Sequence, residues 1–132
     1  MRAYKSFYCH LRILIGLAIT AHGLLRIYDI SEYSNFVLTS YYDMIPSENF
    51  LLIASIVFPF LEFFTGWLIT LKIGIKRALE MGFFISLVMV FFILLGGTYE
   101  RLLYHAAVLT GLSIIYLFVL QLPPHKRATK WS

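Results

Sequence analysis

Four long apolar stretches constrain this chain more than any other feature of its sequence. They cover approximately residues 7–27, 50–71, 78–95 and 102–122. Each is close to the roughly 20 mostly apolar residues that a helix needs to cross a bilayer. None of them alternates apolar and polar residues, as the strands of a membrane barrel do. The sequence therefore predicts an all-α membrane protein with four transmembrane helices in a single domain, residues 1–132.

The composition agrees with this class and excludes several others. Hydrophobic residues make up 60% of the chain and charged residues only 14%, whereas a soluble domain is about 25% charged. Water-soluble and disordered chains are thereby excluded. The single cysteine, Cys9, excludes an intramolecular disulfide and a cysteine-based zinc or iron–sulfur site. The sequence contains no P-loop, HExxH, GxSxG or CxxC motif, so we expect no metal centre and no enzymatic activity of its own.

The distribution of Lys and Arg predicts the orientation in the membrane. These residues gather before the first stretch, between the second and third, and after the fourth: Arg2, Lys5, Lys72, Lys76, Arg77, Lys126, Arg127 and Lys130. The segment from Tyr28 to Asn49 has neither Lys nor Arg and carries four acidic residues. Because positively charged loops stay in the cytoplasm, we expect a multi-pass protein of the bacterial cytoplasmic (inner) membrane with both termini cytoplasmic. The basic residues would then contact anionic lipids and not nucleic acid.

Connection lengths predict how the helices are arranged. Short links between the second, third and fourth helices make them antiparallel neighbours in a four-helix bundle. The segment from Tyr28 to Asn49 is rich in aromatic residues and has no Gly, so we expect a structured, partly helical loop at the extracytoplasmic end. Aromatic rings supply contact area and charges of one sign steer a partner. The residues that we expect to hold a partner protein there are Glu32, Phe36, Tyr42, Asp43, Pro46 and Glu48.

Two charged residues are predicted to lie within the membrane. Arg12 and Glu62 each belong to a helical stripe with small residues at spacings of three and four, a pattern that favours close helix packing. Arg12 is a candidate partner for Glu62, although the opposite lean of side chains on antiparallel helices turns the two apart. The alternatives are that Arg12 reaches the cytoplasmic interface and that Glu62 makes a hydrogen bond between helices.

A second polar group is expected near the outer ends of the first and fourth helices. Its members are His22, Arg26, Glu100, Arg101 and His105. Imidazole offers both a donor and an acceptor nitrogen, so these residues suit the headgroup of a quinone. Two histidines are too few for a usual metal site. The alternative is that the histidines only hydrogen-bond to the loop.

Several of these residues occur in motifs that resemble the DoxX/MauE family of small four-helix membrane proteins. The segment from Leu11 to Gly16 is similar to the family's Arg-containing opening, and Gly23 followed by Arg26 resembles its Gly and basic residue at the helix end. Phe36 with the stretch from Tyr42 to Pro46 resembles the Phe and Tyr-x-x-x-Pro loop pattern of the MauE-like branch. The stretch from Pro59 to Gly66 resembles Pro-x-x-Glu-x-x-x-Gly of the second helix.

The resemblance implies a role beside membrane redox or protein-maturation complexes. MauE-like proteins are associated with maturation of a disulfide-rich extracytoplasmic subunit, and DoxX-like proteins with quinone-linked oxidoreductases. We therefore expect a non-catalytic accessory or scaffold subunit that docks membrane or extracytoplasmic subunits and needs no cofactor. The alternatives are a quinone-interacting subunit of a membrane oxidoreductase and a purely structural small subunit of a large assembly.

Overall fold

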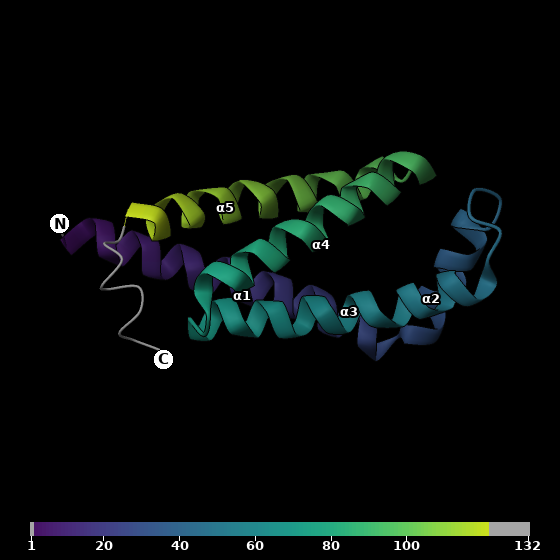
Figure 1. Cartoon of the computed structure of the whole chain (residues 1–132), viewed down its shortest axis with the longest axis horizontal. Coiled ribbons are helices and arrows are strands. Elements are labelled where there is room, and N and C mark those ends of the chain that lie inside the picture. The colour runs from purple at the N-terminus through teal and green to yellow at the C-terminus, as the bar shows by residue number, and fades with distance from the viewer. Residues whose placement is uncertain (1, 122–132) are drawn as a thin grey trace.

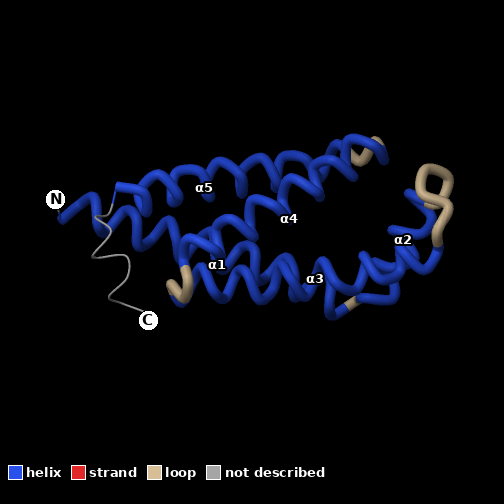
Figure 2. Tube along the Cα trace, in the orientation of Figure 1, coloured by secondary structure: helices blue, strands red, loops and turns tan. Residues whose placement is uncertain are grey.

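A computed structural model of the chain describes residues 2–121 and is helical almost throughout that range (Figures 1 and 2). The helices are α1 (Arg2–Tyr28), α2 (Ile30–Tyr41), α3 (Glu48–Leu71), α4 (Ile75–Gly96), the 3₁₀ turn η1 (Tyr99–Arg101) and α5 (Leu102–Gln121). No strand occurs within residues 2–121. Four helical segments are long and apolar enough to cross a membrane: α1, α3, α4 and η1–α5. The predicted all-α class with four candidate spans is thus confirmed.

The helices extend beyond the apolar stretches that identified them. α1 begins at Arg2, five residues before the predicted start, and α4 begins at Ile75, three residues early. Hydropathy identifies the part of a helix that suits lipid, whereas the hydrogen-bonded turns continue into polar sequence. Leu122 and the predicted topology residues Lys126, Arg127 and Lys130 lie outside the described residues.

The closest packing in the fold joins α1 to α3 through glycines. A Cβ added at Gly16 would lie 2.8 Å from the amide nitrogen of Thr70, and one at Gly23 would lie 2.6 Å from that of Phe63. On the opposite side, a Cβ at Gly66 would lie 2.7 Å from the Gly16 carbonyl oxygen. In lipid the hydrophobic effect does not drive helices together, so they associate by close packing. Small residues make this possible because they let two helix backbones approach each other.

The stripes predicted from the sequence form this interface. On α1 the buried residues are Arg12, Gly16, Ile19, Thr20, Gly23 and Arg26. On α3 they are Leu51, Ser55, Pro59, Glu62, Thr65, Gly66 and Ile69. The charged residues of both stripes therefore point inward, away from lipid.

Two clusters of buried apolar side chains complete the interior. The larger one fills the space between α1, α3, α4 and α5 around Ile69, Leu79 and Leu112. The smaller one joins α2 to α3 through Val37, Tyr41 and Leu51. α2 thus lies across the end of the molecule opposite the N-terminus, as Figure 1 shows.

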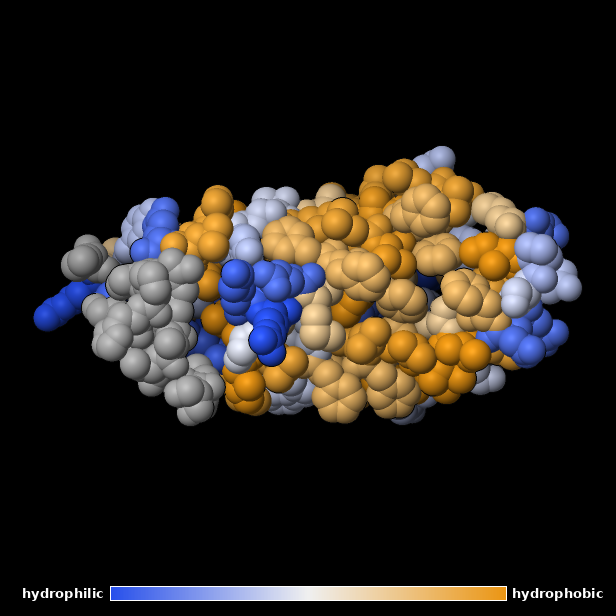
Figure 3. All heavy atoms as spheres, viewed as in Figure 1, coloured by the Kyte–Doolittle hydropathy of each residue, from blue (hydrophilic) through white to orange (hydrophobic). Residues whose placement is uncertain are grey.

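The surface separates into an apolar middle and polar ends. On the face shown in Figure 3, apolar residues cover most of the molecule's length, and polar residues gather at the end where α2 lies. Large apolar side chains such as Leu25, Phe84 and Leu103 are more than half exposed along the helices. An apolar surface of this extent requires a lipid environment.

Candidate functional site

Glu62 is the centre of a buried ion pair between α1 and α3. Its Oε2 atom accepts a hydrogen bond from Arg26 Nη1 at 2.9 Å, and the two side chains are only 5% and 9% exposed. His22 Nδ1 lies 3.4 Å from the same oxygen. A buried carboxylate is stable when it is paired and hydrogen-bonded in this way. The partners come from α1 one helical turn apart, because Arg26 follows His22 by four residues.

The predicted pairing of Arg12 with Glu62 is therefore wrong. Arg12 Nη1 instead donates to the carbonyl oxygen of Ile69 at 2.7 Å and to that of Thr70. These carbonyls belong to the last turn of α3, beyond the regular bonds between residues four apart; the Ile69 carbonyl also accepts from the Lys72 backbone N–H at 3.2 Å. A guanidinium at a helix C-terminus also interacts favourably with the helix dipole. Arg12 has a structural function as a cap for α3.

The two predicted histidines, His22 on α1 and His105 on α5, do lie together. The ring of Tyr104 on α5 contacts both of them. The rings of His22 and Tyr104 stack with centroids 4.2 Å apart and an interplanar angle of 20°. The ring of His105 meets that of His22 edge-on at 5.7 Å. Tyr104 is fixed by its hydroxyl, which donates to the Ala18 carbonyl at 3.3 Å.

His105 is the least satisfied polar residue of this group. Its side chain is 1% exposed, and neither ring nitrogen has a hydrogen-bond partner within residues 2–121. A buried polar group without a partner costs about 1–3 kcal/mol. A ligand that offered His105 a hydrogen bond would recover that free energy.

Two arginines join this cluster to α2 by stacking on aromatic rings. The guanidinium carbon of Arg26 lies 4.9 Å from the centroid of Tyr33, and that of Arg101 lies 4.1 Å from the centroid of Phe36. Contacts of this kind contribute about 0.5–2 kcal/mol each, depending on exposure. Arg26 therefore links α1 to α2 and α3 at once.

An open cleft of about 560 Å³ brings the predicted polar cluster together. All five of its predicted residues line the cleft: His22, Arg26, Glu100, Arg101 and His105. The cleft is also lined by Glu32 and Phe36 from the predicted docking set, and by Tyr33 and Tyr104. Its volume falls within the range of about 300–1,000 Å³ usual for small-molecule sites.

The other residues predicted for docking lie apart from this cleft. Tyr42, Asp43 and Pro46 occupy the turn between α2 and α3, and Glu48 begins α3; all four are exposed. Asp43 and Glu48, together with Asp29, Glu32 and Glu100, give the end around α2 its acidic side chains.

Two titratable groups of α2 have altered acidity. A hydrogen bond with Asp29, reinforced by the charge of that residue, raises the pKa of Glu32 above its ordinary value. Burial raises the pKa of Tyr33, which therefore stays a neutral hydroxyl at the edge of the cleft.

Within residues 2–121, no group of three or more His, Cys, Asp or Glu side chains is placed to hold a metal ion. The cleft is lined by hydrogen-bond donors, by aromatic rings and by the carboxylates of Asp29, Glu32 and Glu100. Tyr33 could not be recognised as a site residue from the sequence, because the stacking of Arg26 on its ring depends on how α2 is placed relative to α1. A signal was present in the spacing, since Tyr33 and Phe36 are three residues apart and share a face of α2.

Comparison with known proteins supplies no further information on this site. The chain matches no family model, no curated protein and no solved structure.

Proposed function

We propose that this protein is a quinone-interacting subunit of a membrane oxidoreductase, with the cleft between α1, α2 and α5 as the headgroup site. The observation that carries the proposal is the convergence of His22, Arg101 and the unpartnered His105 on one cleft of about 560 Å³. Imidazole and guanidinium groups donate hydrogen bonds, and the carbonyl oxygens of a quinone accept them.

The Glu62–His22 contact adds a second property that suits this ligand. Oxidation of a bound quinol would send two electrons to a redox centre of another subunit and release two protons, so a quinol site needs a group that accepts the protons. His22 faces the cleft and contacts the Glu62 carboxylate on its other side. A carboxylate behind a histidine fixes the orientation of the ring.

The proposed setting is a cytoplasmic membrane of bacterial type, crossed by an antiparallel bundle of α1, α3, α4 and α5. Support comes from the separation of charge along the molecule. Arg2, Lys5, Lys72, Lys76 and Arg77 belong to the N-terminal region and to the turn and first residues around α4, whereas Asp29, Glu32, Asp43 and Glu48 belong to the segment around α2. Under the positive-inside rule this puts α2 and the cleft on the extracytoplasmic side. Membership of the DoxX/MauE family is part of the same proposal.

The experiment that tests the proposal measures quinone binding by the purified protein. A solvent extract of the membrane-purified protein should contain quinone, and a short-chain benzoquinone should bind to the protein in detergent. His22→Ala and Arg101→Ala should each weaken that binding at least tenfold, because a hydrogen bond to a charged donor contributes about 1.5–3 kcal/mol.

Matched controls come from a histidine and an arginine that lie outside the cleft. His10 and Arg77 are exposed and do not line the cleft, so His10→Ala and Arg77→Ala should bind the benzoquinone as the parent does. If the parent binds no quinone, or if the His22 and His10 variants behave alike, the proposal is wrong.

A second function, docking of a partner protein as an accessory subunit, is favoured by one observation. Glu32, Asp43, Glu48 and Glu100 are all exposed on segments at the end of the molecule where α2 lies. Charges of one sign on a small surface raise the rate of association with a basic partner. This role is compatible with quinone binding, because Asp43 and Glu48 lie outside the cleft while Glu32 and Glu100 line it.

A further inference from the structure

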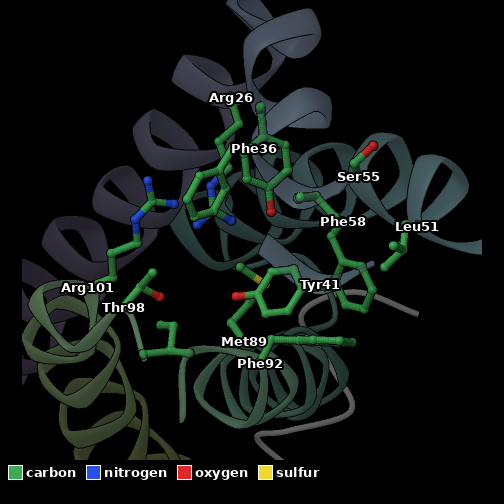
Figure 4. A pocket seen from close by; sticks show the side chains of 14 residues that line it. Arg26, Phe36, Tyr41, Leu51, Ser55, Phe58, Met89, Phe92, Thr98 and Arg101 are labelled. Carbon is green, nitrogen blue, oxygen red and sulfur yellow. The ribbon is translucent and has the colours of Figure 1, made fainter. Parts of the chain in front are cut away.

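A narrow apolar crevice adjoins the polar cleft beneath α2. It lies between α2, α3 and α4, and Figure 4 shows its lining side chains. Its apolar wall includes Tyr41, Leu51, Phe58, Met89 and Phe92. The crevice encloses about 40 Å³, less than a tenth of the volume of the cleft.

The cleft and the crevice share one boundary. Arg26, Tyr33, Phe36 and Arg101 line both of them. On one side of this boundary lie the histidines, and on the other lie only aromatic and aliphatic side chains with the hydroxyls of Ser55 and Thr98. The combined site is therefore polar at one end and apolar at the other, with two guanidinium groups at the junction.

The different sizes of the two parts indicate what each can hold. The cleft has room for a substituted ring, whereas the crevice, at about 40 Å³, has less than a tenth of that volume. The larger, ring-bearing part of a ligand therefore suits the cleft, and the beginning of a slim hydrocarbon chain suits the crevice. Met89 lies on its wall, and the unbranched methionine side chain is flexible enough to widen it for more of the chain.

The crevice is closed on one side by a contact between α2 and α4. The rings of Tyr41 and Phe92 meet edge-on at 5.3 Å, and Tyr41 packs closely against Gly96. Tyr41 is 6% exposed. A chain in the crevice would pass beside this aromatic pair, and Figure 3 shows a hollow in the apolar surface between α4 and the end where α2 lies.

We infer that the crevice holds the first part of the ligand's hydrocarbon tail, so that the protein selects a long-chain amphiphile from the bilayer over a water-soluble ring. This inference rests on the proposed function, because it assumes that the headgroup lies in the cleft. It assigns the ligand a polar, hydrogen-bond-accepting head and an unbranched or isoprenoid chain, joined at the level of Arg26 and Arg101.

The test compares two quinones that differ only in their tail. Binding of a decyl-substituted benzoquinone and of the same ring with a methyl group is measured for the parent and for Ala54→Phe. Ala54 lines the crevice, so a phenyl ring there fills it. We expect Ala54→Phe to bind the decyl compound at least tenfold more weakly while its affinity for the methyl compound stays within about twofold.

The matched control is Ile53→Phe, one residue away. Ile53 is 61% exposed and lies outside the crevice, so this variant should bind both compounds as the parent does. If Ala54→Phe binds both compounds like the parent, or loses both equally, the tail does not lie in the crevice although the headgroup site stands. If the parent binds neither compound, the proposed function itself fails.

A second measurement needs no substitution and holds even if Ala54→Phe does not fold. A benzoquinone with a photoreactive diazirine on the first carbons of its tail is bound to the parent and irradiated. Labelled peptides should contain Phe58, Met89 or Phe92, which line the crevice. Labelling confined to lipid-exposed side chains such as Phe84 and Leu87 would overturn the inference.

Discussion

The carboxylate of Glu62 has two roles: it holds two helices together and it contacts a histidine of the cleft. It joins α1 to α3 through Arg26 and reaches the cleft through His22. Removing one member of a buried pair leaves the other charged and unpaired, which costs about 3–5 kcal/mol. The carboxylate therefore stabilises the fold even if no ligand is bound.

This dual role predicts unequal effects of two substitutions at Glu62. Glu62→Leu should lower the free energy of unfolding by about 3–5 kcal/mol, because Arg26 is then buried without a partner. Glu62→Gln should cost less, since the amide oxygen still accepts a hydrogen bond. Thermal unfolding in detergent measures both. Glu80, which is exposed, provides the control in Glu80→Gln and Glu80→Leu. Equal stability of parent and Glu62→Leu would contradict the assignment.

A prediction about acidity concerns Asp29 and Glu32 at the edge of the cleft. The hydrogen bond and the negative charge of Asp29 raise the pKa of Glu32, so Asp29→Asn should lower it toward the ordinary value. Because the raised pKa favours the protonated form in the fold, this contribution to stability is present at low pH and is lost as pH rises through the folded pKa. The carboxyl carbon signal of Glu32, followed by NMR against pH, measures the change. Glu100→Gln should leave the titration of Glu32 unaltered, because the shift comes from Asp29 and not from Glu100.

At the scale of helices, the glycine contact between α1 and α3 is the feature most sensitive to added volume. Gly23→Ala should destabilise the protein, although alanine is the better helix former by up to about 1 kcal/mol. The added methyl group would lie 2.6 Å from the Phe63 amide nitrogen, which belongs to a helix backbone and cannot move alone.

The matched control for this prediction is Gly82→Ala on α4. There the methyl group would lie 3.2 Å from Leu112 Cδ1, the end of a flexible side chain, so the change should be nearly neutral. Thermal midpoints of both variants in the same detergent give the comparison. A Gly82 variant as unstable as the Gly23 variant would show that the α1–α3 contact is not special.

The helices and their buried faces could be predicted from the sequence, but their relative depth could not. Spacings of three and four residues identified the stripes through Arg12 on α1 and Glu62 on α3, and these stripes are buried. The candidate pairing of Arg12 with Glu62 is not formed, as the opposite lean of their side chains indicated. Arg26 is the partner because its side chain leans from the end of α1 toward the middle of α3.

The site was predictable in its polar half and not in its apolar half. His22, Arg26 and His105 were recognisable because ionisable residues are rare within apolar stretches. Tyr41, Met89 and Phe92 are ordinary apolar residues, and the crevice among them exists only because α2 folds back over α3 and α4. No periodicity within one helix specifies that path.

At the scale of the whole molecule, the separation of charge predicts its sidedness. With Cys9 replaced by Ser, single cysteines at Asp43 and at Lys76 should be labelled from opposite sides of the membrane by a reagent that does not cross it. The Asp43→Cys variant should be labelled in cells or in right-side-out vesicles, because the acidic end is expected to be extracytoplasmic. Labelling of both from the same side would contradict the proposed topology.

The acidic end also predicts how a partner would respond to salt. Changing Glu32, Asp43 and Glu48 together to Gln should leave the bundle folded and weaken binding of a basic partner, most clearly at low ionic strength where screening is least. Co-purification at several salt concentrations measures this. Retention of the partner equal to the parent at every concentration would exclude electrostatic docking by this surface.

The contacts of Arg12, Arg26 and Glu62 have a consequence for how the chain is made. Their hydrogen-bond partners lie within α1 and α3, which are synthesised before α4 and α5. This pair of helices can leave the insertion machinery with Glu62 paired to Arg26 and with Arg12 hydrogen-bonded to the end of α3, before α4 and α5 are made. A ribosome stalled after α3 should therefore yield a stably inserted hairpin, whereas one stalled after α1 would expose two arginines to lipid at once.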